Sequence, residues 1–258
     1  MNSEYLDKLL ASKKYRDVCP DTIRRVWAEC EGKYKKAKDV DRAVRETLHG
    51  ITSAFMTPDE ARHLAWDMQS WYCDPTDASL ERMLQRHAST RERLPIAETD
   101  ALYERLFAVT GRPSAVLDLA CGINPVYLGA RDIPAVGVDI SGAAVDTVNA
   151  FGSNYRLPVS AACADLLCPG AIPKGHFDVA LLFKLLPLLE RQRTGAALDV
   201  MNAIDADFLA VSFPTRTLGG RNVGMAARYS IWMEAHMPRG RRVAGQFETG
   251  NELFYVLN

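Results

Sequence analysis

The stretch VLDLACGINP, residues 116–125, decides the fold class that this sequence predicts. It begins as an apolar run typical of a buried strand, but the run contains Asp118 and gives way to a loop at Gly122. A strand that only filled a hydrophobic core would need neither the acid nor the glycine. Together they indicate a strand that ends above a ligand.

Short β-branched or apolar runs recur after residue 111, and helix-length segments separate most of them. The strand candidates cover residues 115–119, 135–140, 159–162, 179–183 and 208–213. Strands that alternate with helices predict parallel βαβ units in a doubly wound sheet. Residues 241–257 instead place two strand-like runs around Gly250 and Asn251, which is the pattern of a hairpin. We therefore expect an α/β fold with a Rossmann-like, mostly parallel sheet that ends in an antiparallel hairpin.

The chain before residue 111 has a helical pattern. One helix face is predicted by apolar residues at spacings of four, four and three, namely Val40, Val44, Leu48 and Ile51. Thr57, followed by a proline and two acids, predicts the start of another helix. A third helix is expected over residues 78–85, and a longer one follows it, which Pro95 kinks or interrupts near its start.

These patterns divide the chain into an all-helical domain over residues 1–110 and an α/β domain over residues 111–258. The length of 258 residues and the 48% apolar content fit one large domain or a domain with an appendage. No segment approaches about eighteen uninterrupted apolar residues, and the N-terminus lacks the apolar run of a signal peptide, so we expect no membrane partner. Six scattered cysteines without a C-x-x-C pair indicate a reduced, cytoplasmic protein without structural zinc.

Charge is unevenly distributed in a chain whose net charge is −1. Residues 1–50 hold 12 Lys and Arg against 9 Asp and Glu, and residues 214–242 hold six arginines against Glu234 alone. Two separated basic segments fit two edges of one anionic footprint. Ordinary solvated surface charge is the alternative, and composition alone does not separate the two.

Ligands of doubly wound sheets bind beyond the carboxyl ends of the strands. The loop that begins at Asp118 lies there, and Gly122 lets the backbone approach a ligand without a Cβ between them. Asp139 lies twenty-one residues after Asp118, at the end of the second strand. An acid at this position accepts hydrogen bonds from ribose hydroxyls. Asp165 follows the third strand candidate and is placed for an adenine amino group.

The loop after the first strand differs from the G-x-G-x-x-G sequence that binds a pyrophosphate. It has a single glycine, and its Pro125 lacks a backbone N–H. This argues against NAD and for a cofactor that has a ribose and an adenine but no phosphate, such as S-adenosylmethionine. An unrelated α/β domain with acids at its strand ends by chance is the alternative.

Six strings along the chain resemble one family, the aminoglycoside-resistance 16S ribosomal RNA guanine-N7 methyltransferases. They are LASKKYRDVCPDTIRRV (10–26), LHGI (48–51), HASTRERL (87–94), LDLACGINP (117–125), LLFKLLPLLE (181–190) and SFPTRTLGGRNVGM (212–225). The resemblance implies a class I S-adenosylmethionine-dependent methyltransferase domain behind an N-terminal helical domain that docks on the ribosomal RNA. The resemblance carried by these strings also implies a substrate. This is the guanine conventionally numbered 1405, in the decoding-site helix of 16S rRNA in the small (30S) ribosomal subunit. Its methylation would confer resistance to kanamycin- and gentamicin-type drugs.

The residues after the fourth strand candidate fit methyl transfer to a ring nitrogen. Guanine N7 has a free lone pair and no proton, so no general base is required and we assign no catalytic residue. Exocyclic-amine methylation usually places a D/N-P-P-Y/F string there, whereas this chain has FKLLP (183–187). Methylation of pyrimidine C5 needs a cysteine nucleophile, and Cys163 and Cys168 stand outside any loop expected over the base. Catalysis is then mostly proximity and orientation.

The carboxylate of the cofactor needs a cation, and the loop after the first strand offers none. The family motif implies Arg93 for this role, because a guanidinium fork matches a carboxylate. A surface position is the alternative for Arg93, and a core position is the alternative for Phe55. The expected cofactor-binding residues are Phe55, His87, Ala88, Ser89, Arg93, Asp118, Ala120, Gly122, Asp139, Ile140, Asp165, Leu166, Phe183 and Gln192.

The loop after the fifth strand candidate is placed at the same sheet edge, where arginines contact phosphates that flank a flipped base. Basic residues of the helical domain would extend this footprint. The expected RNA-binding residues are Lys13, Lys14, Arg45, His49, Arg216, Arg221 and Met225. A structural role is the alternative for His49, and a place on the buried face of the next helix is the alternative for Met225. No sustained heptad pattern indicates an obligate dimer, so we expect a monomer.

Two other functions stay open on the sequence. A small-molecule methyltransferase would use the extra helices as a lid, but residues 214–242 are arginine-rich where a lid would be apolar. A non-catalytic ribosome-binding protein on the same fold would have lost cofactor binding, but the acids and the glycine at the strand ends are intact.

Overall fold

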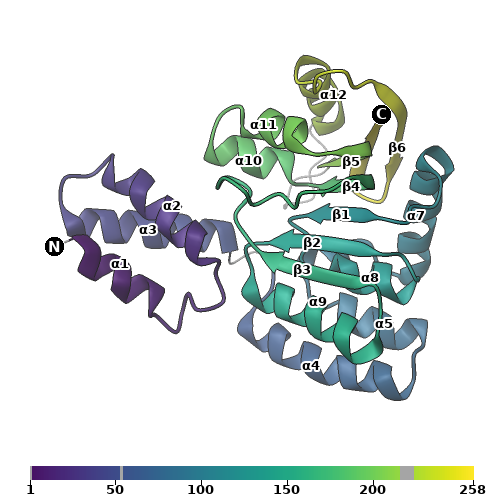
Figure 1. Ribbon diagram of the computed structural model, residues 1–258, viewed down its shortest axis with the longest axis horizontal. Helices are drawn as coiled ribbons and strands as arrows, with labels where there is room; N and C mark the ends of the chain where they lie inside the picture. Colours follow the sequence, from purple (N-terminus) through teal and green to yellow (C-terminus); the bar gives the residue numbers. More distant parts are fainter. Residues whose placement is uncertain (1, 53–54, 216–223) are drawn as a thin grey trace.

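The computed structural model describes residues 2–52, 55–215 and 224–258. A small helical lobe stands beside a larger body in which helices cover both faces of one sheet (Figure 1). The lobe consists of α1 (Asn2–Leu10), α2 (Pro20–Glu31) and α3 (Ala37–Thr52). Within the described residues, no helix is both long enough and apolar enough to cross a membrane.

The lobe has a hydrophobic core of its own. Val40, Val44 and Leu48 of α3 have no exposed surface, which confirms the predicted helix face, and Ile51 continues it half-buried. These side chains share a cluster with Val26 and other apolar residues of α1 and α2. Because burying one aliphatic side chain contributes roughly 1.5–3 kcal/mol, this cluster holds the three helices together.

Residues 58–110 form α4 (Pro58–Cys73), α5 (Asp77–Leu84), α6 (Ala88–Arg91) and α7 (Ile96–Thr110). The predicted start of α4 is confirmed. The Thr57 hydroxyl accepts a hydrogen bond from Glu60 N–H, and the Glu60 carboxylate accepts one from Thr57 N–H. Pro95 stands as the N-cap of α7, so it interrupts the expected long helix rather than kinking it.

The described residues contain a seven-stranded sheet. Its strands are β1 (Val116–Leu119), β2 (Ala135–Asp139), β3 (Val159–Cys163), β4 (Phe177–Phe183), β5 (Ala206–Pro214), β6 (Val243–Thr249) and β7 (Glu252–Leu257). The order is β3-β2-β1-β4-β5-β7-β6, with β7 antiparallel to β5 and β6 and the other pairs parallel. The predicted strands and the terminal hairpin are thus confirmed, and the arrangement is that of a class I methyltransferase.

Two layers of helices enclose the sheet (Figure 1). One face is covered by α4, α5 and α7 together with α8 (Asn124–Ala130) and α9 (Gly142–Tyr155). The other face is covered by α10 (Leu186–Gln192), α11 (Ala196–Ala203) and α12 (Met225–Ala235). The first layer joins α4 and α7 to the sheet, since Leu64 and Leu102 share a cluster with Val116. The boundary expected at residue 110 stays a prediction.

Candidate active site

The carboxyl ends of the parallel strands meet at one edge of the sheet. Leu119 pairs with Val138 and Asp139 pairs with Cys163, so the loops that follow β1, β2 and β3 are neighbours. The loop after β4 joins them because β4 lies beside β1. This edge gathers the predicted cofactor residues Asp118, Ala120, Gly122, Asp139, Ile140, Asp165, Leu166 and Phe183.

Asp139 ties the loop after β1 to the end of β2. Gly122 N–H donates to Asp139 Oδ2 at 2.8 Å, and Ser141 N–H donates to Asp139 Oδ1 at 2.8 Å. Burial raises the pKa of Asp139, and the backbone donors oppose that rise. Each carboxylate oxygen has a second acceptor position, so a carboxylate fixed in this way can accept from both hydroxyls of a ribose.

Position 122 requires glycine because of its backbone conformation and because the His87 ring lies close to it. Its φ is +51°, and a Cβ at this position would lie 2.4 Å from Cε1 of His87. His87 is 5% exposed, and burial lowers its pKa to about 4, so the ring is neutral at physiological pH. Its Nδ1 lies 2.8 Å from Ser89 Oγ.

Phe55 completes this side of the loop. Its ring stacks on His87 with centroids 5.9 Å apart and planes 15° from parallel, and its carbonyl accepts from Ala88 N–H at 2.8 Å. Phe55 is half-buried rather than a core residue. The structure thus brings the predicted residues before α6 against the loop after β1.

Asp118 lies beneath the loop after β1. It is 2% exposed, and its Oδ2 accepts from Asn124 Nδ2 at 2.7 Å. The Asn124 amide also exchanges hydrogen bonds with the Tyr103 hydroxyl. Burial raises the pKa of Asp118 to about 7. Asp118 therefore has little surface for a ligand and supports the loop from below, through an asparagine that the sequence reasoning missed.

Arg93 is buried at the same edge, so the alternative of a surface position is wrong. Its Nε and Nη2 donate to the two carboxylate oxygens of Glu252 at 2.9 and 3.1 Å. Its guanidinium carbon lies 4.7 Å from the centroid of the Phe183 ring. No described residue accepts from Nη1. The ion pair with Glu252 thus fixes the orientation of the guanidinium fork.

Glu252 is the anchor that the sequence reasoning missed. It is 3% exposed and also accepts from Ser212 Oγ at 2.6 Å, and Lys184 Nζ lies 3.3 Å from its Oε1. Burial alone would raise the pKa of Glu252, but Arg93 and Lys184 hold it below its ordinary value. A signal was present, because Glu252 opens β7, a strand whose every residue is buried, and a buried acid needs a cation.

Asp165 has both oxygens engaged. Its Oδ1 accepts from Leu167 N–H at 2.9 Å, and its Oδ2 accepts from Arg25 Nε at 2.9 Å. Arg25 comes from α2 of the lobe, and its Nη2 donates to Oε1 of Gln192 at 2.9 Å. Arg25 was not among the predicted residues, yet it joins two of them.

Two of the predicted RNA-binding residues of the lobe, Lys14 and Arg45, lie over one aromatic ring. Lys14 Nζ lies 5.4 Å from the centroid of Tyr15, and the guanidinium carbon of Arg45 lies 5.9 Å from it. Arg45 also donates to Asp41 Oδ2 at 2.9 Å. Exposed Lys13 precedes this group, and exposed His49 follows Arg45 by one turn of α3.

The remaining predicted RNA contacts follow β5. Arg216 and Arg221 lie outside the described residues. Met225 is the first residue of α12 and is half-buried, and Gly224 before it has a φ of +63°. The position of Met225 is thus compatible with both readings, an RNA contact and the start of a packed helix face.

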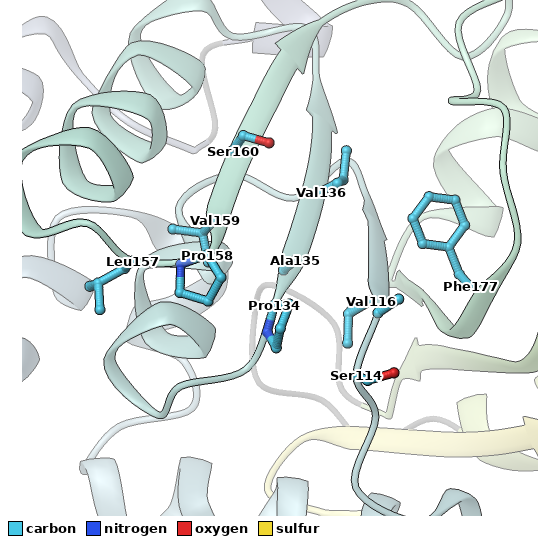
Figure 2. A pocket seen from close by; sticks show the side chains of 11 residues that line it. Ser114, Val116, Pro134, Ala135, Val136, Leu157, Pro158, Val159, Ser160 and Phe177 are labelled. Carbon is cyan, nitrogen blue, oxygen red and sulfur yellow. The ribbon is translucent and has the colours of Figure 1, made fainter.

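A shallow hollow of about 350 Å³ lies at the other edge of the sheet, where the strands begin (Figure 2). Its lining includes Ser114, Pro134, Val136, Ser160 and Phe177. None of its lining residues is ionisable, so the hollow offers no charged partner to a cofactor or to RNA.

The chain is similar to known methyltransferases of ribosomal RNA over nearly its full length. A family model described as ribosomal RNA methyltransferase (FmrO) matches residues 11–256. The chain is 40% identical over 256 residues to a 16S rRNA (guanine(1405)-N(7))-methyltransferase of Serratia marcescens, with 99% of this chain and 97% of the relative covered. It is 35% identical over 259 residues to a protein of the same name from Frankia casuarinae, with 95% and 89% covered.

Solved structures of 16S rRNA methyltransferases match the fold of this chain. The fold matches that of the 16S rRNA methyltransferase RmtF in complex with S-adenosyl-L-homocysteine with a TM-score of 0.90, 41% identity, and 100% and 97% of the two chains covered. It matches the 16S rRNA methylase RmtB with a TM-score of 0.88, 36% identity, and 100% and 98% covered. The chain therefore belongs to the ribosomal RNA methyltransferase (FmrO) family.

Proposed function

We propose that this protein methylates N7 of guanine 1405 in 16S rRNA, as the names of its relatives state for them. It is a methyltransferase, S-adenosylmethionine is its cofactor and ribosomal RNA is its substrate. The observation that carries the proposal is that side chains at the carboxyl edge of the sheet are already held in place. Backbone N–H groups fix the Asp139 carboxylate, and Glu252 fixes the Arg93 guanidinium.

The residues at this edge fit S-adenosylmethionine piece by piece. Asp139 would accept from the ribose hydroxyls, and Nη1 of Arg93 would take the carboxylate of the methionine part. Asp165 and Gln192 would meet the adenine, and the stacked rings of Phe55 and His87 would line the loop. When bound, the cofactor supplies an activated methyl group on its sulfonium.

The protein contributes orientation to this reaction. Guanine N7 attacks through a free lone pair and carries no proton, so no side chain has to remove one. His87 is neutral and buried, and its ring packs on Gly122, which fits a lining role. Holding N7 in line with the methyl group is then the main source of rate, and we assign no catalytic residue.

The lobe of α1–α3 is the proposed docking surface for RNA. Lys14 and Arg45 both lie over the ring of Tyr15, where phosphates of a folded RNA can be neutralised together. Met225 and the arginines after β5 would meet the target nucleotide itself. We propose that the substrate is the assembled 30S subunit, because two separated basic surfaces require a preformed RNA shape. We further propose a cytoplasmic monomer.

The test is transfer of a labelled methyl group from S-adenosylmethionine. Purified protein is incubated with 30S subunits, deproteinised 16S RNA or intact ribosomes, and label in the RNA is counted. We expect label with 30S subunits and little with the other two substrates. Absence of label in all three would contradict the function, and equal rates on free RNA would contradict the assembled substrate.

A further inference from the structure

One side chain of the lobe reaches the adenine end of the proposed cofactor site. Arg25 of α2 donates through Nε to Asp165 at 2.9 Å, through Nη2 to Gln192 at 2.9 Å, and through Nη1 to Glu29 at 2.8 Å. The Arg25 side chain is 12% exposed and that of Asp165 is 4% exposed. Every nitrogen of the guanidinium is thus engaged, and two of the three partners belong to the larger body.

The lobe also contacts the ribose end of the site through backbone atoms. Cys19 N–H donates to the Ile140 carbonyl at 2.8 Å, and Gly142 N–H donates to the Asp17 carbonyl at 2.7 Å. Between these two bonds lies Ser141, which forms a bridge with Val18 and whose N–H holds Asp139. The segment between α1 and α2 therefore runs along the residues that fix the ribose-binding carboxylate.

The same lobe carries the proposed RNA contacts. Lys14 and Tyr15 stand in the segment that reaches Asp17 and Cys19, within five residues of the backbone bonds. The lobe has its own hydrophobic cluster, so these polar contacts contribute much of its attachment at the cofactor edge. A change in the position of the lobe would alter the hydrogen bonds that Asp165 and Ile140 accept from it.

We propose that Arg25 is a positioning residue that couples cofactor binding to docking on the ribosomal subunit. Through its hydrogen bonds, Arg25 fixes Asp165 and Gln192 in position to bind the adenine. The same bonds fix the lobe in the position in which it docks on the RNA. The proposal rests on the proposed function, since it requires both S-adenosylmethionine and the subunit as ligands. Coupling of this kind is reciprocal, so each ligand must raise the affinity for the other by the same factor.

The physical reason is the buried charge pair. An arrangement of the lobe that separates Arg25 from Asp165 leaves a carboxylate that is 4% exposed without its cation, which is costly. A cofactor that needs Asp165 in place therefore favours the docked lobe, and RNA that fixes the lobe favours the assembled adenine site. If Arg25 served only to attach the lobe, its loss would lower both affinities but leave their mutual effect unchanged.

The experiment measures that mutual effect on the full chain. Labelled S-adenosyl-L-homocysteine is used as the probe because it cannot transfer a methyl group. Its dissociation constant is measured by equilibrium dialysis with and without saturating 30S subunits, and subunit affinity is measured with and without the probe. We expect both ratios to be equal in the wild type and at least about fivefold.

Arg25→Ala should bring both ratios to within about twofold of one, while Arg25→Lys, which keeps the charge but not the fork, should recover part of the effect. Arg24→Ala is the matched control. It removes the same charge from the neighbouring residue of α2, which is exposed and pairs with Asp21 at 2.9 Å. Its ratios should equal those of the wild type.

Gln192→Leu provides a second variant if Arg25→Ala does not fold by circular dichroism. It removes one arm of the Arg25 contact, and the ratio divides out any direct loss of cofactor contact, so a reduced ratio is expected. Wild-type ratios near one, or unchanged ratios in these variants, would overturn the coupling. A wild type that binds neither ligand would instead contradict the proposed function.

Discussion

Arg93 and Glu252 form a bidentate ion pair, with hydrogen bonds of 2.9 and 3.1 Å, although 159 residues separate them in the chain. Their side chains are 6% and 4% exposed. The pair joins the segment before α7 to the terminal hairpin, and no described residue accepts from Nη1 of the guanidinium. The hairpin, which lies beyond the parallel part of the sheet, thus contributes an anchor to the proposed cofactor site.

Glu252→Gln should damage both stability and cofactor binding. It leaves the buried charge of Arg93 without its counter-ion, so we expect the free energy of unfolding to fall by about 3 kcal/mol. Affinity for S-adenosylmethionine should fall at least about tenfold, because the fork is no longer fixed. Urea denaturation and calorimetry measure the two effects. The control is Glu248→Gln on exposed β6, which should change stability by less than about 0.5 kcal/mol. Equal stability of the two variants would contradict the role of Glu252.

Gly122→Ala should abolish cofactor binding at concentrations that saturate the wild type. The new Cβ would lie 2.4 Å from the His87 ring in a backbone with a φ of +51°, so the loop after β1 must move. Gly50→Ala is the matched control, because a Cβ there meets no atom within 4 Å and Gly50 lies in α3. It should bind normally and gain up to about 1 kcal/mol of stability. Normal cofactor binding by Gly122→Ala would place the site elsewhere.

Asp118 predicts a specific pH dependence. Burial raises its pKa to about 7, above the ordinary value of 3.8, so the folded protein binds a proton that the unfolded chain has released. This contribution to stability is fully present below about pH 4 and is lost as the pH rises through about 7. Relative to the wild type, Asp118→Asn should therefore gain about 2 kcal/mol between about pH 5 and pH 8. Urea denaturation at several pH values checks this, and a difference that is independent of pH would show that Asp118 titrates normally.

A substitution in the lobe should change binding to the 30S subunit, whereas a substitution in α12 should change the rate of methylation. Lys14→Ala should weaken 30S binding and flatten its dependence on salt, because the proposed role of the lysine is to neutralise a phosphate. Met225→Ala should leave subunit affinity within about twofold but slow single-turnover methylation steeply, since its proposed contact would form with the extruded base. Lys174→Ala is the control, because exposed Lys174 precedes β4 at the opposite edge of the sheet. If Lys14→Ala slowed only chemistry and Met225→Ala abolished only binding, the two surfaces would be reversed.

The fold followed from local patterns, whereas the anchors of the site did not. Alternation of apolar runs with helix-length segments predicted the strands, and Gly250 with Asn251 predicted the hairpin, because periodicity and turn chemistry are local properties. The position of Asp139 followed as well, since parallel strands must end at one edge. The strand ends thus predicted which edge of the sheet carries the candidate site.

The contacts that preset the site depend on tertiary packing. Arg25 meets Asp165 across 140 residues, and no spacing rule joins a surface helix to a loop that far away. The family motif named Arg93 as a ligand but not Glu252 as the residue that orients it. Asn124 is nearer, six residues from Asp118, yet its role appears only once the loop after β1 has folded back over the acid.

The identity of the modified atom, N7 of guanine 1405, can be measured directly. 16S RNA from 30S subunits treated with the protein and S-adenosylmethionine is reduced with borohydride, cleaved with aniline and read by primer extension. Aniline cuts only where a guanine carried a methyl group on N7. We predict a single enzyme-dependent cut at guanine 1405, and resistance to kanamycin- and gentamicin-type drugs in cells that make the protein. Methyl label in the RNA without a cut, or a cut at another guanine, would contradict it.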